Sequence, residues 1–114
     1  AMNFYVSLFP NSRIVAIERY QAGEAGQEGT VKRAMFELNA TPYICIDSSV
    51  THAFTFTPAI SLFVECETLE QQEQAFERLS SDGQVLMPLD SYGFSTRFAW
   101  VQDRYGVSWQ LNLV

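Results

Sequence analysis

The spacing of hydrophobic residues in the first fifty positions predicts a short helix followed by three strands. Met2 and Tyr5 follow helical spacing until Pro10 interrupts the pattern, so we expect the helix to end there. Three segments carry the β-branched or alternating residues that are typical of strands, at residues 13–20, 30–38 and 42–48. The last two of these segments form a predicted hairpin that turns at Asn39 and Ala40.

The second half of the chain has the pattern of a strand, a helix and three further strands. Ile60 and Val64 belong to an alternating run that predicts a strand over residues 59–66. Thr68 can cap the next helix, Gln71 completes a capping box, and Gly83 is expected to end the helix in a left-handed conformation. Short strands are expected at residues 84–88, 97–102 and 107–114, the last two joined by a turn at residues 103–106.

The element order is therefore α-β-β-β followed by β-α-β-β-β. It predicts an α+β fold in which two βαβββ modules form a curved mixed sheet around a concave pocket. We expect a single domain over residues 1–114, with module one at about residues 1–50 and module two at about residues 59–114. In this order the opening strand of module one is missing.

Composition narrows the classes of partner. The 114 residues carry a net charge of −6 with a pI of about 4.5, which repels phosphate backbones and anionic lipids, so we expect neither nucleic acid nor a membrane as partner. The first residues, AMNFYVSLFPNS, lack the basic region and cleavage site of a signal peptide. Cys45 and Cys66 form no C-x-x-C pair, and we expect two free thiols in a cytoplasmic protein.

Two segments of this sequence carry a family resemblance. NFYVSLFPNSRI near the start and WVQDRYGVSWQLNL near the end resemble the PhnB-like branch of the glyoxalase/bleomycin-resistance/dioxygenase (vicinal-oxygen-chelate) superfamily. Members of this branch are often labelled 3-demethylubiquinone-9 3-methyltransferase-like domains. The resemblance covers essentially the whole chain and implies the same paired βαβββ fold that the element order predicts.

The methyltransferase label would require a site for S-adenosylmethionine, which we do not expect here. Such a site usually needs a glycine-rich turn between a strand and a helix. Gly23, Gly26 and Gly29 have a suitable spacing but lie in an acidic loop between two predicted strands. That loop would offer no helix N-terminus to the cofactor.

The resemblance also implies positions for a divalent metal, on the first and last strands of each module. The residues at three of these positions are Asp47, Ser61 and Gln110, and the fourth position falls on the missing strand. Ser61 and Gln110 are neutral, weak ligands, so we expect the metal site to be lost and no cofactor to be required.

Strand alternation predicts the lining of the pocket. A four-residue loop in the last hairpin would put Gln110 on one face with Arg97 and would pair Trp100 with Trp109 in the core. Arg97 could bind a carboxylate or phosphate, or it could form an ion pair with a nearby aspartate. The full set of predicted ligand-binding residues is Ser61, Arg97, Gln110, Asp47 and Tyr43.

Three functions remain open from the sequence. The first is a small-molecule-binding protein or weak enzyme without a metal, and the second is a metal-dependent lyase, isomerase or dioxygenase. The third is a drug-sequestering protein that holds a flat compound between aromatic walls such as Phe36, Tyr43 and Phe63. For each of them we expect a small-molecule ligand of unknown identity and a homodimer, because open sheet edges need covering and a two-fold dimer is the commonest assembly.

Overall fold

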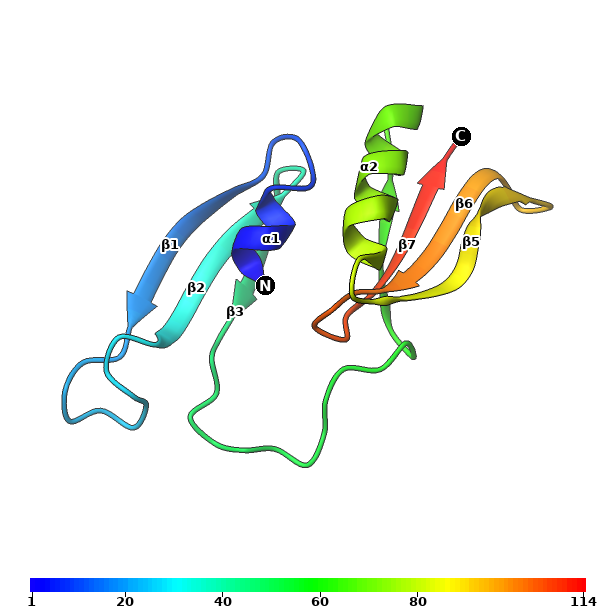
Figure 1. Cartoon of the computed structure of the whole chain (residues 1–114). Helices are drawn as coiled ribbons and strands as arrows, with labels where there is room; N and C mark the ends of the chain where they lie inside the picture. Colours follow the sequence, from blue (N-terminus) through cyan, green and yellow to red (C-terminus); the bar gives the residue numbers. More distant parts are fainter. The chain divides into compact units, whose positions relative to one another are not determined.

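The structure is a computed structural model that describes residues 1–114. It contains two compact units, Ala1–Ala53 and Phe54–Val114, each with its own sheet (Figure 1). The element order is α-β-β-β in the first unit and β-α-β-β-β in the second, so the predicted α+β class and element order are confirmed. The chain has no helix with the length and apolar character needed to cross a membrane.

In the first unit a short helix covers an antiparallel three-stranded sheet. Helix α1 (Met2–Val6) precedes strands β1 (Arg13–Arg19), β2 (Val31–Leu38) and β3 (Thr41–Cys45), which lie in the order β1-β2-β3. The β2–β3 turn falls at Asn39 and Ala40, as predicted, and both residues have positive φ angles, 50° and 65°. The buried hydrophobic residues of this unit are Tyr5, Phe9, Ala34, Phe36 and Leu38.

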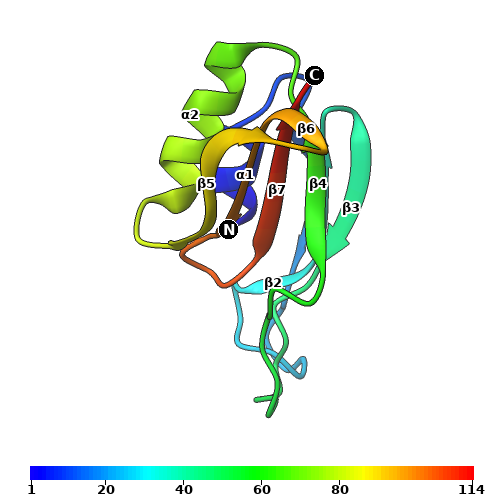
Figure 2. The same cartoon turned by 90° about the vertical axis from the view of Figure 1, so that its right-hand side faces the viewer.

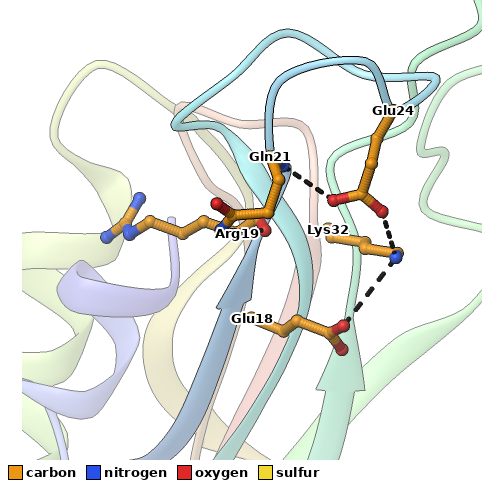
Figure 3. Close-up of polar contacts among 5 residues, drawn as sticks. All are labelled: Glu18, Arg19, Gln21, Glu24 and Lys32. Atoms are coloured by element: carbon orange, nitrogen blue, oxygen red, sulfur yellow. Dashed lines mark hydrogen bonds and ion pairs between the residues drawn. The ribbon is translucent and has the colours of Figure 1, made fainter.

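The loop between β1 and β2 is held by an exposed charge network (Figure 3). Lys32 Nζ lies 2.6 Å from Glu24 Oε2 and 3.8 Å from Glu18 Oε1, and Glu24 Oε1 accepts a hydrogen bond from the backbone N–H of Gln21 at 2.7 Å. The hydrogen bond from Lys32 lowers the pKa of Glu24, and the same bond raises the pKa of Lys32. Lys32 is therefore already neutralised by two carboxylates.

In the second unit one helix covers one face of a four-stranded sheet. Its elements are β4 (Ser61–Glu65), α2 (Leu69–Ser80), β5 (Gln84–Tyr92), β6 (Ser95–Gln102) and β7 (Ser108–Leu113). The strand order is β4-β7-β6-β5, with β4 parallel to β7 and the other pairs antiparallel. Helix α2 contacts β5, β6 and β7 and leaves the opposite face of the sheet without a helix from this unit (Figure 2).

A capping hydrogen bond and a close approach of two backbones explain where α2 begins and ends. Thr68 is the N-cap, as predicted, because its Oγ1 accepts a hydrogen bond from the N–H of Gln71. At the other end the prediction is wrong in one respect, because the left-handed residue is Asp82, with a φ of 59°, and not Gly83. A Cβ at Gly83 would overlap the backbone carbonyl oxygen of Gln102, so the glycine is needed for close packing of two backbones.

The register of the last hairpin differs by one residue from the prediction. Gln102 pairs with Ser108, so the loop contains the five residues from Asp103 to Val107 instead of four. Asp103 Oδ1 accepts hydrogen bonds from the backbone N–H groups of Tyr105 and Val107, and the Asp103 N–H donates to the carbonyl oxygen of Val107, so Asp103 and Val107 face each other across the hairpin. Gly106, with a φ of 91°, supplies the left-handed position at the end of the tight turn between Asp103 and Val107.

This register determines which side chains share a face. Trp109 pairs with Val101 and Trp100 pairs with Gln110, so the predicted Trp100–Trp109 pair does not form. Val101, Trp109 and Leu111 are fully buried on the face that α2 covers. Because partners in register point to the same side of a sheet, Trp100 lies on the other face with Gln110.

Candidate functional site

The face of the second sheet that α2 does not cover is the candidate functional site. We call it the open face. The pairing of its strands brings side chains from β4, β7 and β6 to this side. They are Ser61, Phe63 and Glu65 from β4, Ser108, Gln110 and Asn112 from β7, and Phe98, Trp100 and Gln102 from β6.

Three of these residues form a hydrogen-bonded row across the start of β4 and β7. Ser61 Oγ lies 2.6 Å from Ser108 Oγ, and the Trp100 Nε1–H donates to Ser108 Oγ at 2.7 Å. Ser108 is 1% exposed, whereas Ser61 and Trp100 are half-buried. The row therefore joins a buried hydroxyl to one that solvent or a ligand can reach.

Gln110 occupies the middle of the open face. It pairs in register with Phe63 on one side and with Trp100 on the other. Phe63 is 56% exposed, Gln110 is half-buried, and the Gln110 amide has no hydrogen-bond partner within the protein. A neutral amide with a free donor and a free acceptor thus lies between two aromatic side chains.

The other end of the open face carries a polar pair beside an aromatic group. Asn112 Nδ2 donates to Glu65 Oε2 at 2.9 Å, which fixes the only charged group of β4 that lies on this face. Phe98 is buried because Phe63, Tyr92 and Phe94 surround its ring, with ring centroids 6.4, 6.0 and 4.9 Å away. These aromatic contacts give this end of the open face a rigid apolar wall.

Arg97 does not lie on the open face, so the prediction that it lines one surface with Ser61 and Gln110 is wrong. It pairs with Leu113 on the face covered by α2, and its Nη2 lies 2.9 Å from Glu73 Oε1 of that helix. The ion pair was foreseen, although with an aspartate as partner. The other two arginines of this unit, Arg78 and Arg104, lie on α2 and in the β6–β7 turn, so no strand position of the open face carries a cation.

Asp47 and Tyr43 belong to the first unit and lie in two different surroundings. The Tyr43 ring stacks on buried Phe36 at 5.6 Å, on the side where Cys45 contacts Met2 of α1. Asp47 follows the end of β3 and lines a shallow hollow of about 390 Å³. The other residues of this loop hollow are Tyr20, Ala25, Gly26, Gln27, Thr30, Ser48 and Ser49.

The remaining candidates for reactive chemistry are inert or dispersed. Burial raises the pKa of Cys66 to about 11, with a smaller contribution from Glu65, and burial followed by Asp47 raises the pKa of Cys45. Both thiols are free and protonated at neutral pH, so neither is an activated nucleophile. Nowhere in the chain do three or more His, Cys, Asp or Glu side chains form a group that could hold a metal ion.

Sequence reasoning missed Trp100 as a residue of this site. The assumed four-residue loop put Trp100 in the core, whereas the observed register puts it beside Gln110. The signal that could have corrected this is the pair Asp103 and Gly106, since Asp favours side-chain hydrogen bonds within a loop and Gly a left-handed residue at its end. These two residues therefore indicated the observed register in the sequence.

Comparison with known proteins assigns the chain to a family. Residues 1–112 match the family described as 3-demethylubiquinone-9 3-methyltransferase. The chain belongs to this family. A PhnB protein from Bacillus cereus, to which the same methyltransferase name has been assigned, has 57% sequence identity and a TM-score of 0.94, over 99% of this chain and 88% of that one. The predicted PhnB-like resemblance is confirmed.

More distant structures share the fold alone. Protein PA1353 from Pseudomonas aeruginosa has 18% identity and a TM-score of 0.82, over 97% of this chain and 84% of that one. TioX from Micromonospora sp. ML1 has 14% identity and a TM-score of 0.62, over 97% and 85%. No match was found among the curated proteins.

The methyltransferase in the family's name implies S-adenosylmethionine, and the residues of this chain do not fit that cofactor. The loop with Gly23, Gly26 and Gly29 joins β1 to β2, and no helix follows it. The one strand-to-helix turn, from β4 to α2, contains no glycine, and the Gln71 N–H in the first turn of α2 already donates to Thr68 Oγ1. Neither place offers the glycine-rich helix N-terminus that a nucleotide cofactor usually needs.

Proposed function

We propose that this PhnB-like protein is a small-molecule-binding protein or weak enzyme that works without a metal, and that its ligand binds on the open face. The observation that carries the proposal is the unpartnered amide of Gln110 between Phe63 and Trp100. Apolar side chains with a few directed polar groups are the usual composition of a small-molecule site. The aromatic pair would stack on a planar ligand, and the amide would fix its orientation.

The charge distribution favours an uncharged ligand. Glu65 lies on the open face, and Asp90 pairs in register with Phe98 at its edge. With Arg97 bonded to Glu73 on the opposite face, an anionic ligand would meet carboxylates and no compensating cation. The loop hollow is a weaker candidate, because its walls are mostly small loop residues and Asp47 is the only ionisable carboxylate among them.

Replacing Gln110 by Ala tests the proposal. The probe is coumarin, a planar and uncharged aromatic lactone, whose binding is followed by NMR because fragments of this size bind with a Kd of about 1 mM. We expect Gln110→Ala to weaken coumarin binding about fivefold, which corresponds to about 1 kcal/mol. Gln74→Ala, an exposed glutamine on α2, is the matched control and should leave binding unchanged. Equal affinities of both variants would contradict the assignment to the open face.

Metal independence is the second part of the proposal. At the family's metal positions Ser61 Oγ is bonded to Ser108, and Gln110 offers only a neutral amide oxygen. We expect protein purified without added metal to contain less than about 0.1 equivalent of zinc, nickel, iron or manganese by mass spectrometry, and coumarin binding to be unchanged by EDTA. A stoichiometric metal, or loss of binding in EDTA, would favour the alternative of a metal-dependent lyase, isomerase or dioxygenase.

The third function considered, drug sequestration between aromatic walls, keeps only part of its support. Phe36 is 8% exposed and Tyr43, which stacks on it, is half-buried, so of the three named walls Phe63 is the most exposed. The open face nevertheless offers an aromatic surface beside carboxylates, which would suit a planar cation. Tighter binding of N-methylquinolinium than of coumarin would favour this function over an uncharged ligand.

We also propose that the chain forms a homodimer. In each sheet the outer strands, β1 and β3 or β4 and β5, have one edge that pairs with no strand of the same sheet. Open edges are normally covered, and a two-fold dimer is the commonest means of covering them. Light scattering at micromolar concentration should give a mass near twice 12.9 kDa, and a mass of 12.9 kDa would refute the dimer.

A further inference from the structure

The hydrogens shared by Ser61, Ser108 and Trp100 can be assigned by counting donors and acceptors. The indole Nε1–H of Trp100 can only donate, so Ser108 Oγ accepts that bond. The hydroxyl hydrogen of Ser108 then needs an acceptor, and Ser61 Oγ, 2.6 Å away, is the one that the protein provides. Because Ser108 is 1% exposed, the opposite direction would leave a buried hydroxyl hydrogen unpaired.

The direction of the hydrogen bonds in this row determines whether Ser61 can donate a hydrogen bond to a ligand. Ser61 Oγ accepts from Ser108, and the Ser61 hydroxyl hydrogen has no acceptor within the protein. Ser61 is half-buried on the open face, beside the exposed ring of Phe63 two residues along β4. The Trp100–Ser108–Ser61 row therefore ends in an O–H group that must find its acceptor outside the chain.

We propose that Ser61 is the specificity-determining donor of the open face, and that through this O–H group it recognises a carbonyl oxygen of a planar, uncharged ligand. The inference rests on the proposed function, because it names the chemistry that the same face selects. A carbonyl oxygen suits the site better than a carboxylate. The charged groups at strand positions of this face are Glu65 and Asp90, and both would repel a negatively charged ligand. Trp100 and Ser108 are positioning residues, because they act on the ligand only through Ser61.

Three probes distinguish the contribution of the Ser61 hydrogen bond to binding from that of stacking on the aromatic side chains. Coumarin carries the carbonyl, 2H-chromene has the same ring system with a methylene group in its place, and coumarin-3-carboxylate adds a negative charge. We expect the wild-type protein to bind coumarin about tenfold more tightly than 2H-chromene, and to bind the carboxylate more weakly than coumarin. Titration by NMR gives all three affinities under one condition.

Variants at Ser61 test whether its hydroxyl group causes the preference for coumarin over 2H-chromene. Ser61→Ala should bring the coumarin-to-chromene ratio to about one by weakening coumarin binding alone. If Ser61→Ala does not fold, the isosteric pair Ser61→Thr and Ser61→Val replaces it, since threonine keeps the donor and valine removes it at the same volume. Retention of the ratio in Ser61→Thr and its loss in Ser61→Val would support the assignment.

The outcomes that overturn the inference differ from those that overturn the proposed function. Equal binding of coumarin and 2H-chromene by the wild-type protein, or an unchanged ratio in Ser61→Ala or Ser61→Val, would refute Ser61 as the donor while leaving ligand binding on the open face in place. Failure of both neutral probes to bind would refute the proposed function and the inference together.

Discussion

Replacing Asp103 by Ala is expected to lower the free energy of unfolding of the second unit by about 4 kcal/mol. Asp103 is 4% exposed and its carboxylate accepts three hydrogen bonds. Oδ1 bonds the N–H groups of Tyr105 and Val107, and Oδ2 bonds Trp109 Nε1 at 2.8 Å. Alanine would leave the buried Trp109 N–H without this acceptor and would release the loop that sets the β6–β7 register.

Urea unfolding followed by tryptophan fluorescence measures this loss, because the only two tryptophans of the chain lie in the second unit. Asp90→Ala is the matched control, since Asp90 is exposed and bonds only the N–H of its neighbour Ser91. It should change the unfolding free energy by less than about 0.5 kcal/mol. A double-mutant cycle of Asp103→Asn with Trp109→Phe should give a coupling of about 1.5 kcal/mol, and no coupling would contradict the role given to their hydrogen bond.

Gln72→Glu is expected to lower the free energy of unfolding about as much as Asp103→Ala does at neutral pH, and by less in acid. Gln72 is fully buried, and its Nε2 donates to the carbonyl oxygens of Arg97 and Leu111 at 3.0 and 3.1 Å, which fastens α2 to β6 and β7. An introduced carboxylate would face these two oxygens without a donor of its own. We expect a loss of about 4 kcal/mol at pH 8.

The pH dependence of this variant has a definite sign. Burial and the two carbonyl oxygens raise the pKa of the introduced carboxyl group in the folded state above its value in the unfolded chain. As pH falls through the folded pKa, the folded state takes up a proton and the deficit relative to wild type becomes smaller. Gln74→Glu, at an exposed position of the same helix, should show neither the loss nor this dependence. A deficit that grows in acid would contradict the assignment.

The elements of this fold were predictable because they depend on local patterns. The capped start of α2 at Thr68 and the hairpin turn at Asn39 and Ala40 each follow from a few adjacent residues. The family was also predictable, since its two motifs lie at the two ends of the chain. These features require no knowledge of which strands pair.

The face of each residue on β6 and β7 was not predicted, because register is not a local property. One added residue in the loop moves every side chain of one strand to the opposite face relative to its partner. The observed register is held by the side chain of Asp103, which accepts hydrogen bonds from Val107 and from Trp109. Alternation alone could therefore place Gln110 on a polar face but could not decide whether Arg97 or Trp100 would lie beside it.

The account predicts that the open face binds a planar, uncharged ligand, and the two indole N–H signals of the protein test this claim most directly. Trp100 Nε1–H lies on the open face and donates to Ser108, whereas Trp109 Nε1–H is buried and donates to Asp103. In a proton–nitrogen NMR titration with coumarin and EDTA present, the Trp100 signal should shift with saturation and the Trp109 signal should stay in place. An unmoved Trp100 signal, or shifts confined to Tyr20, Asp47 and the other residues of the loop hollow, would contradict the account.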